Sequence, residues 1–315
     1  MVNFDDCKLD AFHSYGGSDK KLCRIFNGDS YMLKVADRIS LEGNLAASYS
    51  NSIYSEYVCC HIISILGLDV QETVLGTVTT ESQKTGEQEE KPVVGCKNFL
   101  KDNQNLIEFA TIEDDALSEK GAKLPKLMDI NYIFKTNSSR YLNSEKLRQK
   151  AERRYWDMFI IDAFLGNFDR HHNNWGYIAE KNLETGDSTI KLAPIYDCGS
   201  CLYPQIAEDQ LERVLNSEDE INERVYKFPN AALVDEDGKK INYFKFINSL
   251  KNEDCNKALL RIYPLIKTHW TEIEKFILSV EEISEVRKKF YIVMLKNRSE
   301  KILEPAYRKI KLYNR

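Results

Sequence analysis

The sequence lacks the features that define several protein classes. Its 315 residues contain no apolar stretch long enough to span a membrane, and the amino terminus, MVNFDDCKLD, has acidic residues where a secretory signal would place basic ones. The formal net charge is −5, so the chain has no basic surplus of the kind that nucleic-acid-binding proteins carry. We therefore expect a cytoplasmic protein with no membrane contact and no direct nucleic-acid contact.

Cysteine, proline and glycine are too scattered to define a special architecture. The eight cysteines form no evident disulfide framework, because a chain of this length can build a core without cross-links. Cys198 and Cys201 form a CxxC pair, but no second CxxC and no nearby histidine pair completes a tetrahedral metal set in the sequence. We expect most of the thiols to be reduced and buried.

The hydrophobic pattern changes near residue 100. Before that point, Asn27-Gly28 between two apolar runs predicts a β-hairpin, and the polar tract 81–91 predicts the tip of a second one. The elements expected in this part are strands at 22–26, 30–36, 70–80 and 92–99 and a helix at 50–68. Without a long linker or an internal repeat, this pattern predicts an α+β chain with a strand-rich N-lobe over residues 1–100.

After residue 100 the pattern is mainly helical. A core helix is expected at 147–167, where the second half becomes steadily more apolar, and a short strand pair is expected around 175–178 and 189–195. Helical periods then continue from 209 to 313. We therefore predict a helical C-lobe over residues 101–315.

Three polar residues in and after the stretch GNFDRHHNNW have the chemistry that phosphoryl transfer requires. Asp169 can accept a proton from an acceptor hydroxyl, while Asn174 and Asp197 offer the oxygen ligands that Mg²⁺ prefers. Asp and Asn are also common in turns and helix caps, so each residue alone is a weak signal. Because all three occur in the order that phosphoryl transfer requires, the sequence predicts that Asp169 is a catalytic aspartate and that Asn174 and Asp197 are metal ligands.

The upstream part of the chain supplies the complementary groups in the matching order. Gly16 and Gly17, followed by Ser18, form a loop that can approach phosphates with bare backbone N–H groups. Lys34 lies late in the second strand of the hairpin, among apolar neighbours, where a charged group needs a partner. Glu56 on the following helix is the expected partner, with Glu42 and Glu72 as alternatives.

These residues resemble a known family. DRHHNN followed by YDCG, with YMLK and SEYVCCHIISILGL upstream, is similar to the HipA-like kinases, and most closely to their branch of cell-translocating kinases. The resemblance covers most of residues 12–265. It implies a two-lobed, protein-kinase-like fold and phosphorylation of serine or threonine with ATP and Mg²⁺, and we expect the chain to phosphorylate itself as well. Delivery to a host cell is known in that branch, but this sequence carries no signal for it.

The resemblance also assigns residues by motif. It implies that Asp169 is the catalytic aspartate, that Lys34 binds phosphate, and that Asn174 and Asp197 bind metal. It further implies that Lys97, Asn98 and Phe99 form the hinge whose backbone meets adenine. The catalytic motif reads DRH rather than HRD, Cys198 stands where DFG has phenylalanine, and no APE motif follows. Ser18 is a regulatory phosphosite candidate by position alone.

Other residues of the opening motif are expected to have structural roles. Adjacent histidines rarely bind one ion, so we expect His171 either to shape the loop or to assist the transferred phosphate. Trp175 and Tyr177 are expected in the core rather than as stacking platforms.

Two alternative functions remain open at this point. The first alternative is a phosphoinositide or small-molecule kinase that uses the same set of residues, because DRHxxN followed by D-x-G is also similar to the motifs of phosphoinositide kinases. A nucleotide-binding, toxin-like module held by a DNA-binding antitoxin is the other alternative, and either an antitoxin or a host protein is a conceivable partner besides the protein substrate.

Overall fold

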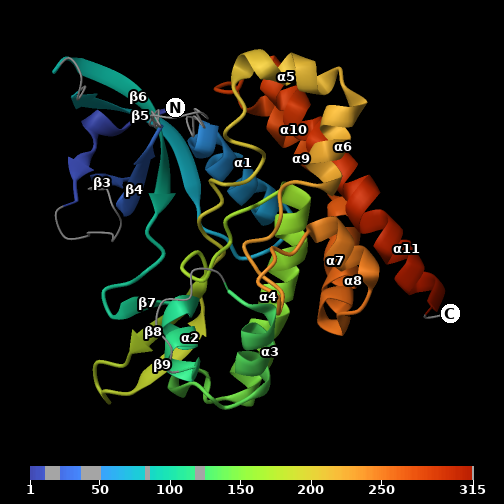
Figure 1. The fold of residues 1–315 in the computed structure, drawn as a ribbon. Coiled ribbons are helices and arrows are strands. Elements are labelled where there is room, and N and C mark those ends of the chain that lie inside the picture. The colour runs from blue at the N-terminus through green and yellow to red at the C-terminus, as the bar shows by residue number, and fades with distance from the viewer. Residues whose placement is uncertain (11–21, 37–50, 82–85, 118–124, 314–315) are drawn as a thin grey trace. The chain divides into compact units, whose positions relative to one another are not determined.

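The chain divides into two compact units. The computed structural model describes residues 1–10, 22–36, 51–81, 86–117 and 125–313. The first unit comprises Met1–Phe99 and Cys198–Ala207, and the second comprises Leu100–Asp197 and Glu208–Arg315 (Figure 1). The chain thus returns to the first unit for one short segment, directly after Asp197.

A mixed sheet forms the frame of the first unit. The described strands run in the order β1-β5-β6-β4-β3-β2. The elements of this unit are β1 Val2–Asn3, η1 Phe4–Asp6, β2 Lys8–Leu9, β3 Leu22–Phe26, β4 Asp29–Val35, α1 Ser52–Ile65, β5 Thr73–Glu81 and β6 Gln88–Lys97. Asn27 and Gly28 both have positive φ, 52° and 87°, which gives the tight turn that pairs β3 with β4. The hairpin predicted from Asn-Gly is confirmed.

Two glycines let an aromatic side chain lie flat on this sheet. A Cβ added at Gly76 would lie 2.6 Å from the ring of Phe4, and one added at Gly95 would lie 2.7 Å from it. Phe4 can therefore pack onto β5 and β6 only because both strands carry glycine there. Tyr31 and Val93 complete the buried cluster around this ring.

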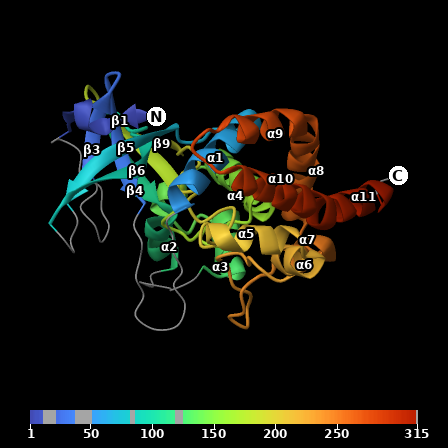
Figure 2. The ribbon, with the colours of Figure 1, turned by 90° about the horizontal axis from the view of Figure 1, so that it is seen from above.

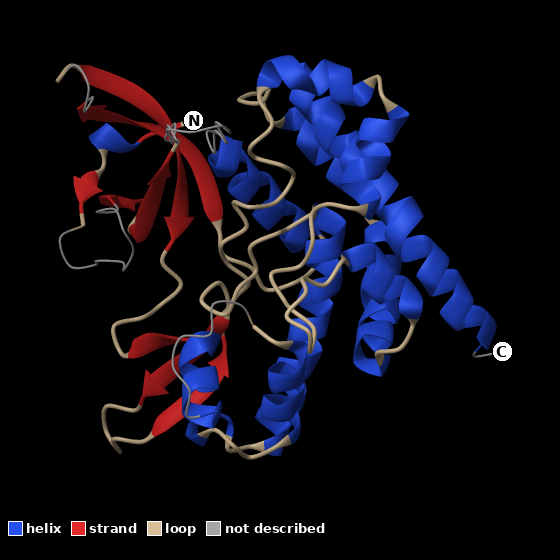
Figure 3. Ribbon diagram, viewed as in Figure 1, coloured by secondary structure: helices blue, strands red, loops and turns tan. Residues whose placement is uncertain are grey.

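Helix α1 packs against β5 and β6 of the same unit (Figure 3). Its buried residues are Ile53, Ser55, Glu56, Val58, Cys59, Cys60, Ile62 and Ile63. A carboxylate at a fully buried position of such a helix must be paired with a charge or hydrogen-bond donors. The helix ends where Gly67 adopts a φ of 76°.

The second unit combines a small antiparallel sheet, β7-β8-β9, with many helices. Its elements are β7 Gln104–Glu108, α2 Phe109–Leu117, α3 Leu127–Lys135, η3 Arg140–Leu142, α4 Glu145–Leu165, β8 Gly176–Lys181, β9 Ser188–Leu192, α5 Glu208–Leu215, α6 Glu218–Tyr226, α7 Tyr243–Ser249, α8 Glu253–Thr268, α9 Trp270–Ser279, α10 Glu285–Arg298, η4 Ser299–Leu303 and α11 Glu304–Tyr313. The mainly helical character and the β8–β9 pair are as predicted. The strand β7 was not predicted, because its partner β8 lies far away in sequence.

Helix α4 is the centre of the second unit. Every residue from Tyr155 to Leu165 is buried, and α8, α10 and α3 pack around it. A helix that is buried on all sides needs no amphipathic pattern. It ends at Gly166, whose φ of 73° gives the left-handed cap and turns the chain into the stretch that carries Asp169.

Long helices brace the carboxyl end of α4. Figure 2 shows α10 and α11 following one another to the C-terminus, joined by the π-helical turn η4. Buried Arg298, at the end of α10, donates to the carbonyl of Ala163 at 2.7 Å and to that of Arg224 at 2.8 Å. Among the described helices, none is long and apolar enough to cross a membrane.

Candidate active site

The loop after α4 is held by hydrogen bonds to Asn167. The Asn167 side chain donates to the Asp162 carboxylate at 2.9 Å and accepts from the N–H of Asp169 at 3.0 Å. The hydroxyl of Tyr243 donates to the Asn167 carbonyl at 2.9 Å. The backbone leading to Asp169 is therefore fixed from both sides by buried polar groups.

Buried Arg170 connects this loop with the segment that ends in Asp197. Its guanidinium donates to both oxygens of Asp162, at 3.1 and 3.2 Å. It also donates to the carbonyls of Asn174 at 2.9 Å, Asp197 at 3.2 Å, and Tyr196. A planar, always charged fork is suited to this many fixed acceptors. Arg170 thus clamps the two loops that carry the predicted catalytic and metal-binding residues.

Asp169 combines access with an unusual electrostatic setting. Its side chain is 50% exposed, so an incoming hydroxyl can reach it. Partial burial raises the pKa of this carboxyl, and the negative charge of Asp197 raises it further, while His171, Arg170 and Lys240 act in the opposite direction. A positive charge placed between the two carboxylates would relieve their repulsion.

Asn174 and Asp197 fit the requirements of a hard cation. The amide nitrogen of Asn174 donates to the Asp169 carbonyl at 2.7 Å, which leaves the amide oxygen as its ligand group. Asp197 has a φ of 59°, a backbone conformation that few non-glycine residues adopt and that is concentrated at functional sites. One amide oxygen and a carboxylate beside a second carboxylate form an oxygen donor set that suits Mg²⁺.

The remaining residues of the loop divide between surface and core. His171 is partly exposed, with its Nε2 4.0 Å from the Asp169 carboxylate. His172 is buried and hydrogen-bonded to Glu113, which gives it a structural role. Trp175 stacks on Phe109 at a ring distance of 4.2 Å and is buried, so its expected place in the core is confirmed.

In the first unit, Lys34 of β4 and Glu56 of α1 form an ion pair. The Lys34 Nζ lies 2.7 Å from Glu56 Oε2, with side-chain exposures of 24% and 0%. Glu72 does not compete for Lys34, because it pairs with Lys97 at 3.2 Å. Glu42 lies outside the described residues, as do Gly16, Gly17 and Ser18.

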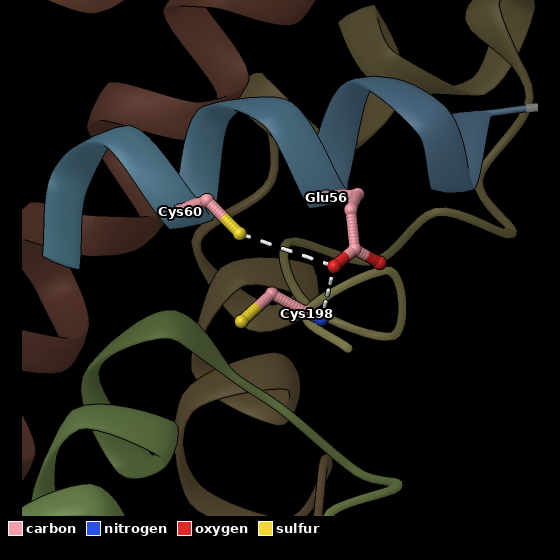
Figure 4. Close-up of side chains that lie close together, drawn as sticks. All are labelled: Glu56, Cys60 and Cys198. Carbon is pink, nitrogen blue, oxygen red and sulfur yellow. Dashed lines mark hydrogen bonds between the residues drawn. The ribbon is translucent and has the colours of Figure 1, made fainter. Parts of the chain in front are cut away.

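The segment after Asp197 holds the other oxygen of Glu56. The backbone N–H of Cys198 donates to Glu56 Oε1 at 2.8 Å, and the thiol of Cys60 lies 3.9 Å from the same oxygen (Figure 4). At Gly199 an added Cβ would lie 3.1 Å from Glu56 Oε2, so a side chain there would press on the carboxylate. These contacts fix the carboxylate that faces Lys34.

Cys60 was missed by sequence reasoning. Glu56, Cys60 and Cys198 have potential ligand atoms within 4.8 Å of one another, and all three are buried. The spacing of Glu56 and Cys60, one helical turn apart on α1, was the signal available in the sequence. A cation here would compete with Lys34 for Glu56, so we assign the thiols a packing and positioning role.

The thiol cluster extends to two further cysteines. Cys201 is hydrogen-bonded to Cys198 and Cys59, and burial together with these contacts raises its pKa well above the ordinary value. The hydrogen bond to Cys198 and burial raise the pKa of Cys60 well above its ordinary value. All of these cysteines are free thiols, as expected from the sequence.

The segment expected as the hinge follows β6. The N–H of Lys97 donates to the Glu72 carbonyl at 2.9 Å, and the N–H of Asn98 donates to the Ser30 carbonyl at 2.8 Å. The Lys97 ammonium bonds to Asp29 and Glu72, which raises its pKa to about 12. Both N–H groups thus serve the sheet.

Comparisons with known proteins agree on one family. The HipA-like C-terminal domain family matches residues 13–262. The chain is 37% identical over 308 residues to the serine/threonine-protein kinase CtkA of Helicobacter pylori, covering 97% of this chain and 87% of CtkA.

Solved structures give the same result for the fold. The crystal structure of the Helicobacter pylori proinflammatory kinase CtkA matches with a TM-score of 0.85 and 36% identity, over 99% of this chain and 98% of CtkA. HipA in the Shewanella oneidensis MR-1 complex with HipB and operator DNA matches with a TM-score of 0.52 and 12% identity, over 95% and 68% of the two chains. The HipA match supports the fold alone.

Proposed function

The chain belongs to the family of HipA-like C-terminal domains, and on this basis we propose that it is a serine/threonine protein kinase that uses ATP and Mg²⁺. The observation that carries the proposal is the clamp formed by Arg170. It holds an accessible carboxylate, Asp169, and the two candidate metal ligands on loops that share one buried guanidinium. A purely structural turn has no need for this arrangement.

Asp169 has the central role in the proposed reaction. Its carboxylate orients the acceptor hydroxyl and takes its proton as the hydroxyl oxygen bonds to the γ-phosphorus of ATP, while the bond from that phosphorus to the bridging oxygen breaks and ADP leaves. Asn174 and Asp197 hold Mg²⁺, which when bound neutralises charge on the phosphate oxygens. Because the clamp fixes these groups before the substrate binds, catalysis is mainly positional and electrostatic.

The first unit supplies the groups for the nucleotide. The Lys34 ammonium, held by Glu56, contacts phosphate oxygens through its exposed end. We expect the loop with Gly16, Gly17 and Ser18 to cover the phosphates, and the backbone of the hinge Lys97–Phe99 to meet the adenine. The family relationship supports these three assignments.

Transfer of labelled phosphate tests the proposal. The purified protein is incubated with γ-labelled ATP, Mg²⁺ and a generic protein substrate, and label is counted on the substrate and on the chain itself. We expect transfer to serine or threonine, with some label on the chain, and a loss of at least about a hundredfold in Asp169→Asn. Asp187→Asn, an exposed aspartate of the same unit, is the matched control.

Two results would decide against the proposal. Equal labelling of wild type and Asp169→Asn would show that transfer does not depend on this carboxylate. Label on added phosphoinositides but on no protein would assign the site to a lipid kinase. Where protein is labelled, the phosphoamino acids released by acid hydrolysis show whether serine or threonine is the acceptor.

A further inference from the structure

A hollow lined by lysines lies in the second unit, near the end of α6 and the start of α7. It measures about 530 Å³, and its walls carry four lysines, Lys227, Lys239, Lys240 and Lys245, against one acid, Asp235. This balance contrasts with a chain whose net charge is −5. An anionic ligand is therefore the complement of this surface.

Most of the positive charge in the hollow is uncompensated by protein groups. Lys227 pairs with Glu223 at 3.6 Å, whereas Lys239, Lys240 and Lys245 are exposed and form no ion pair with any described residue. The Asp235 carboxylate is occupied by its own turn, where it accepts from the N–H of Lys239 at 2.8 Å. Three lysine ammonium groups thus face solvent around one opening.

The floor of the hollow and its neighbour limit what can bind. Leu127, Ile241 and Phe246 give the floor apolar surface, so a bare inorganic anion would leave much of the space unfilled. An adjoining hollow of about 500 Å³ is lined by three acids, Asp219, Glu220 and Glu223, and by Lys227. Glu220 pairs with Arg224 and Glu223 with Lys227, so this hollow offers an added carboxylate no unpaired cation among its lining residues. A ligand with one anionic group at the end of an apolar chain fits this combination.

Residues that directly adjoin the walls of the hollow in sequence contact the catalytic loop. Phe228, next to Lys227, packs its ring against Phe168 at 5.8 Å, one residue before Asp169. Asn242, which lines the hollow, donates to the Tyr226 carbonyl at 2.9 Å, and the adjacent Tyr243 is bonded to the loop.

These contacts place the hollow beside the loop that carries Asp169. A chain segment seated in the hollow would therefore lie next to the loop that presents Asp169 to the acceptor hydroxyl.

We propose that this hollow binds an aspartate or glutamate side chain that flanks the acceptor serine or threonine in the protein substrate. The inference rests on the proposed kinase function and adds a substrate class to it. The carboxylate meets Lys239, Lys240 and Lys245, while its stem and an apolar neighbour cover the floor. The acidic hollow alongside excludes a second acidic side chain there and so fixes the direction in which the substrate lies.

Peptide binding without ATP tests the inference separately from catalysis. Three fluorescent peptides carry one serine and, at the same flanking positions, glutamate, glutamine or lysine. Fluorescence anisotropy gives their Kd for the wild type, for Asp169→Asn, and for a double variant with Lys239→Gln and Lys245→Gln. Lys289→Gln with Lys309→Gln, which removes two exposed lysines elsewhere in the unit, is the control.

We expect the glutamate peptide to bind about fivefold more tightly than the glutamine peptide, which is the effect of two or three solvent-exposed charge pairs. The preference should disappear in the Lys239/Lys245 double variant and persist in the control. Replacing both lysines by glutamate should invert it in favour of the lysine peptide. The same order should hold in Asp169→Asn.

Several results would overturn the inference. One is equal affinity for the three peptides in the wild type, and another is an acidic preference that survives the double variant. A third is binding of phosphoinositide-containing vesicles that needs these lysines while peptide binding does not. Failure of the kinase proposal would instead appear as absent phosphate transfer, with this binding pattern unchanged.

Discussion

The ion pair between Lys34 and Glu56 makes a quantitative prediction about stability. At 2.7 Å and an effective dielectric constant of about 20, the gross attraction of the two charges is about 6 kcal/mol. Desolvation of Glu56, which is fully buried, offsets much of this attraction. The informative quantity is therefore the free energy lost when only one partner is removed.

Lys34→Met leaves the Glu56 carboxylate buried without its ammonium partner. Breaking a buried pair from one side costs about 3 to 5 kcal/mol, and we expect the lower end because the N–H of Cys198 still donates to Glu56. Glu56→Gln should cost less, about 1 to 2 kcal/mol, because Lys34 is partly exposed and can regain water. The double variant contains no buried charge, so it should cost only about 2 kcal/mol.

Urea unfolding of the four proteins measures this cycle. The expected coupling free energy is about 2 to 3 kcal/mol, and Lys8→Met, at an exposed position of β2, should be neutral. Phosphate transfer should be lost in both single variants and should not return in the double variant, although the double variant should be more stable than Lys34→Met. Additive costs within about 0.5 kcal/mol would refute the reasoning, because they would mean that the two side chains do not depend on each other.

Three further predictions concern the clamp, the catalytic carboxyl and the thiols. Arg170→Lys, which loses the planar fork, should cost about 2 to 4 kcal/mol in thermal unfolding and reduce phosphate transfer, and unchanged stability would contradict the clamp. Because burial raises the pKa of Asp169 in the substrate-free protein, kcat/KM should rise with pH as this carboxyl loses its proton, at a pH above the ordinary aspartate range. A rise of kcat/KM within that ordinary range would contradict the burial argument. In a native protein treated with a thiol reagent, Cys7 should react first, because the other seven of the eight cysteines are buried, and all eight should react in denaturant.

Local patterns predicted the elements whose determinants lie close together in sequence. The β3–β4 hairpin follows from Asn27-Gly28, since the positive φ values of its turn are a property of these two residues. The end of α4 follows from Gly166 in the same way. By contrast, β7 pairs with a strand about seventy residues later, and nothing within Gln104–Glu108 indicates that partner.

The site residues show the same division. Asp169, Asn174 and Asp197 were predicted as site residues from their chemistry and their order along the chain, and this assignment stays a prediction. The pairing of Lys34 with Glu56, rather than Glu72, depended on which helix packs beneath β4 and β6, and only the structure decides it. Cys60 lies one helical turn from Glu56, which the sequence shows, but its contact with Cys198 joins segments more than a hundred residues apart, and no local pattern indicates that contact.

A charged residue inside an apolar helical run nevertheless carries usable information. Asp162 lies in MFIIDAFL and Glu56 lies in SIYSEYVCC, and both positions are buried. Because an unpaired buried carboxylate costs several kcal/mol, each must be matched by a cation or by several donors from elsewhere in the fold. Their partners are Arg170 and Lys34, two residues of the candidate active site. The buried carboxylates thus mark the helix positions from which this chain fixes its reactive groups, before any of those contacts is known.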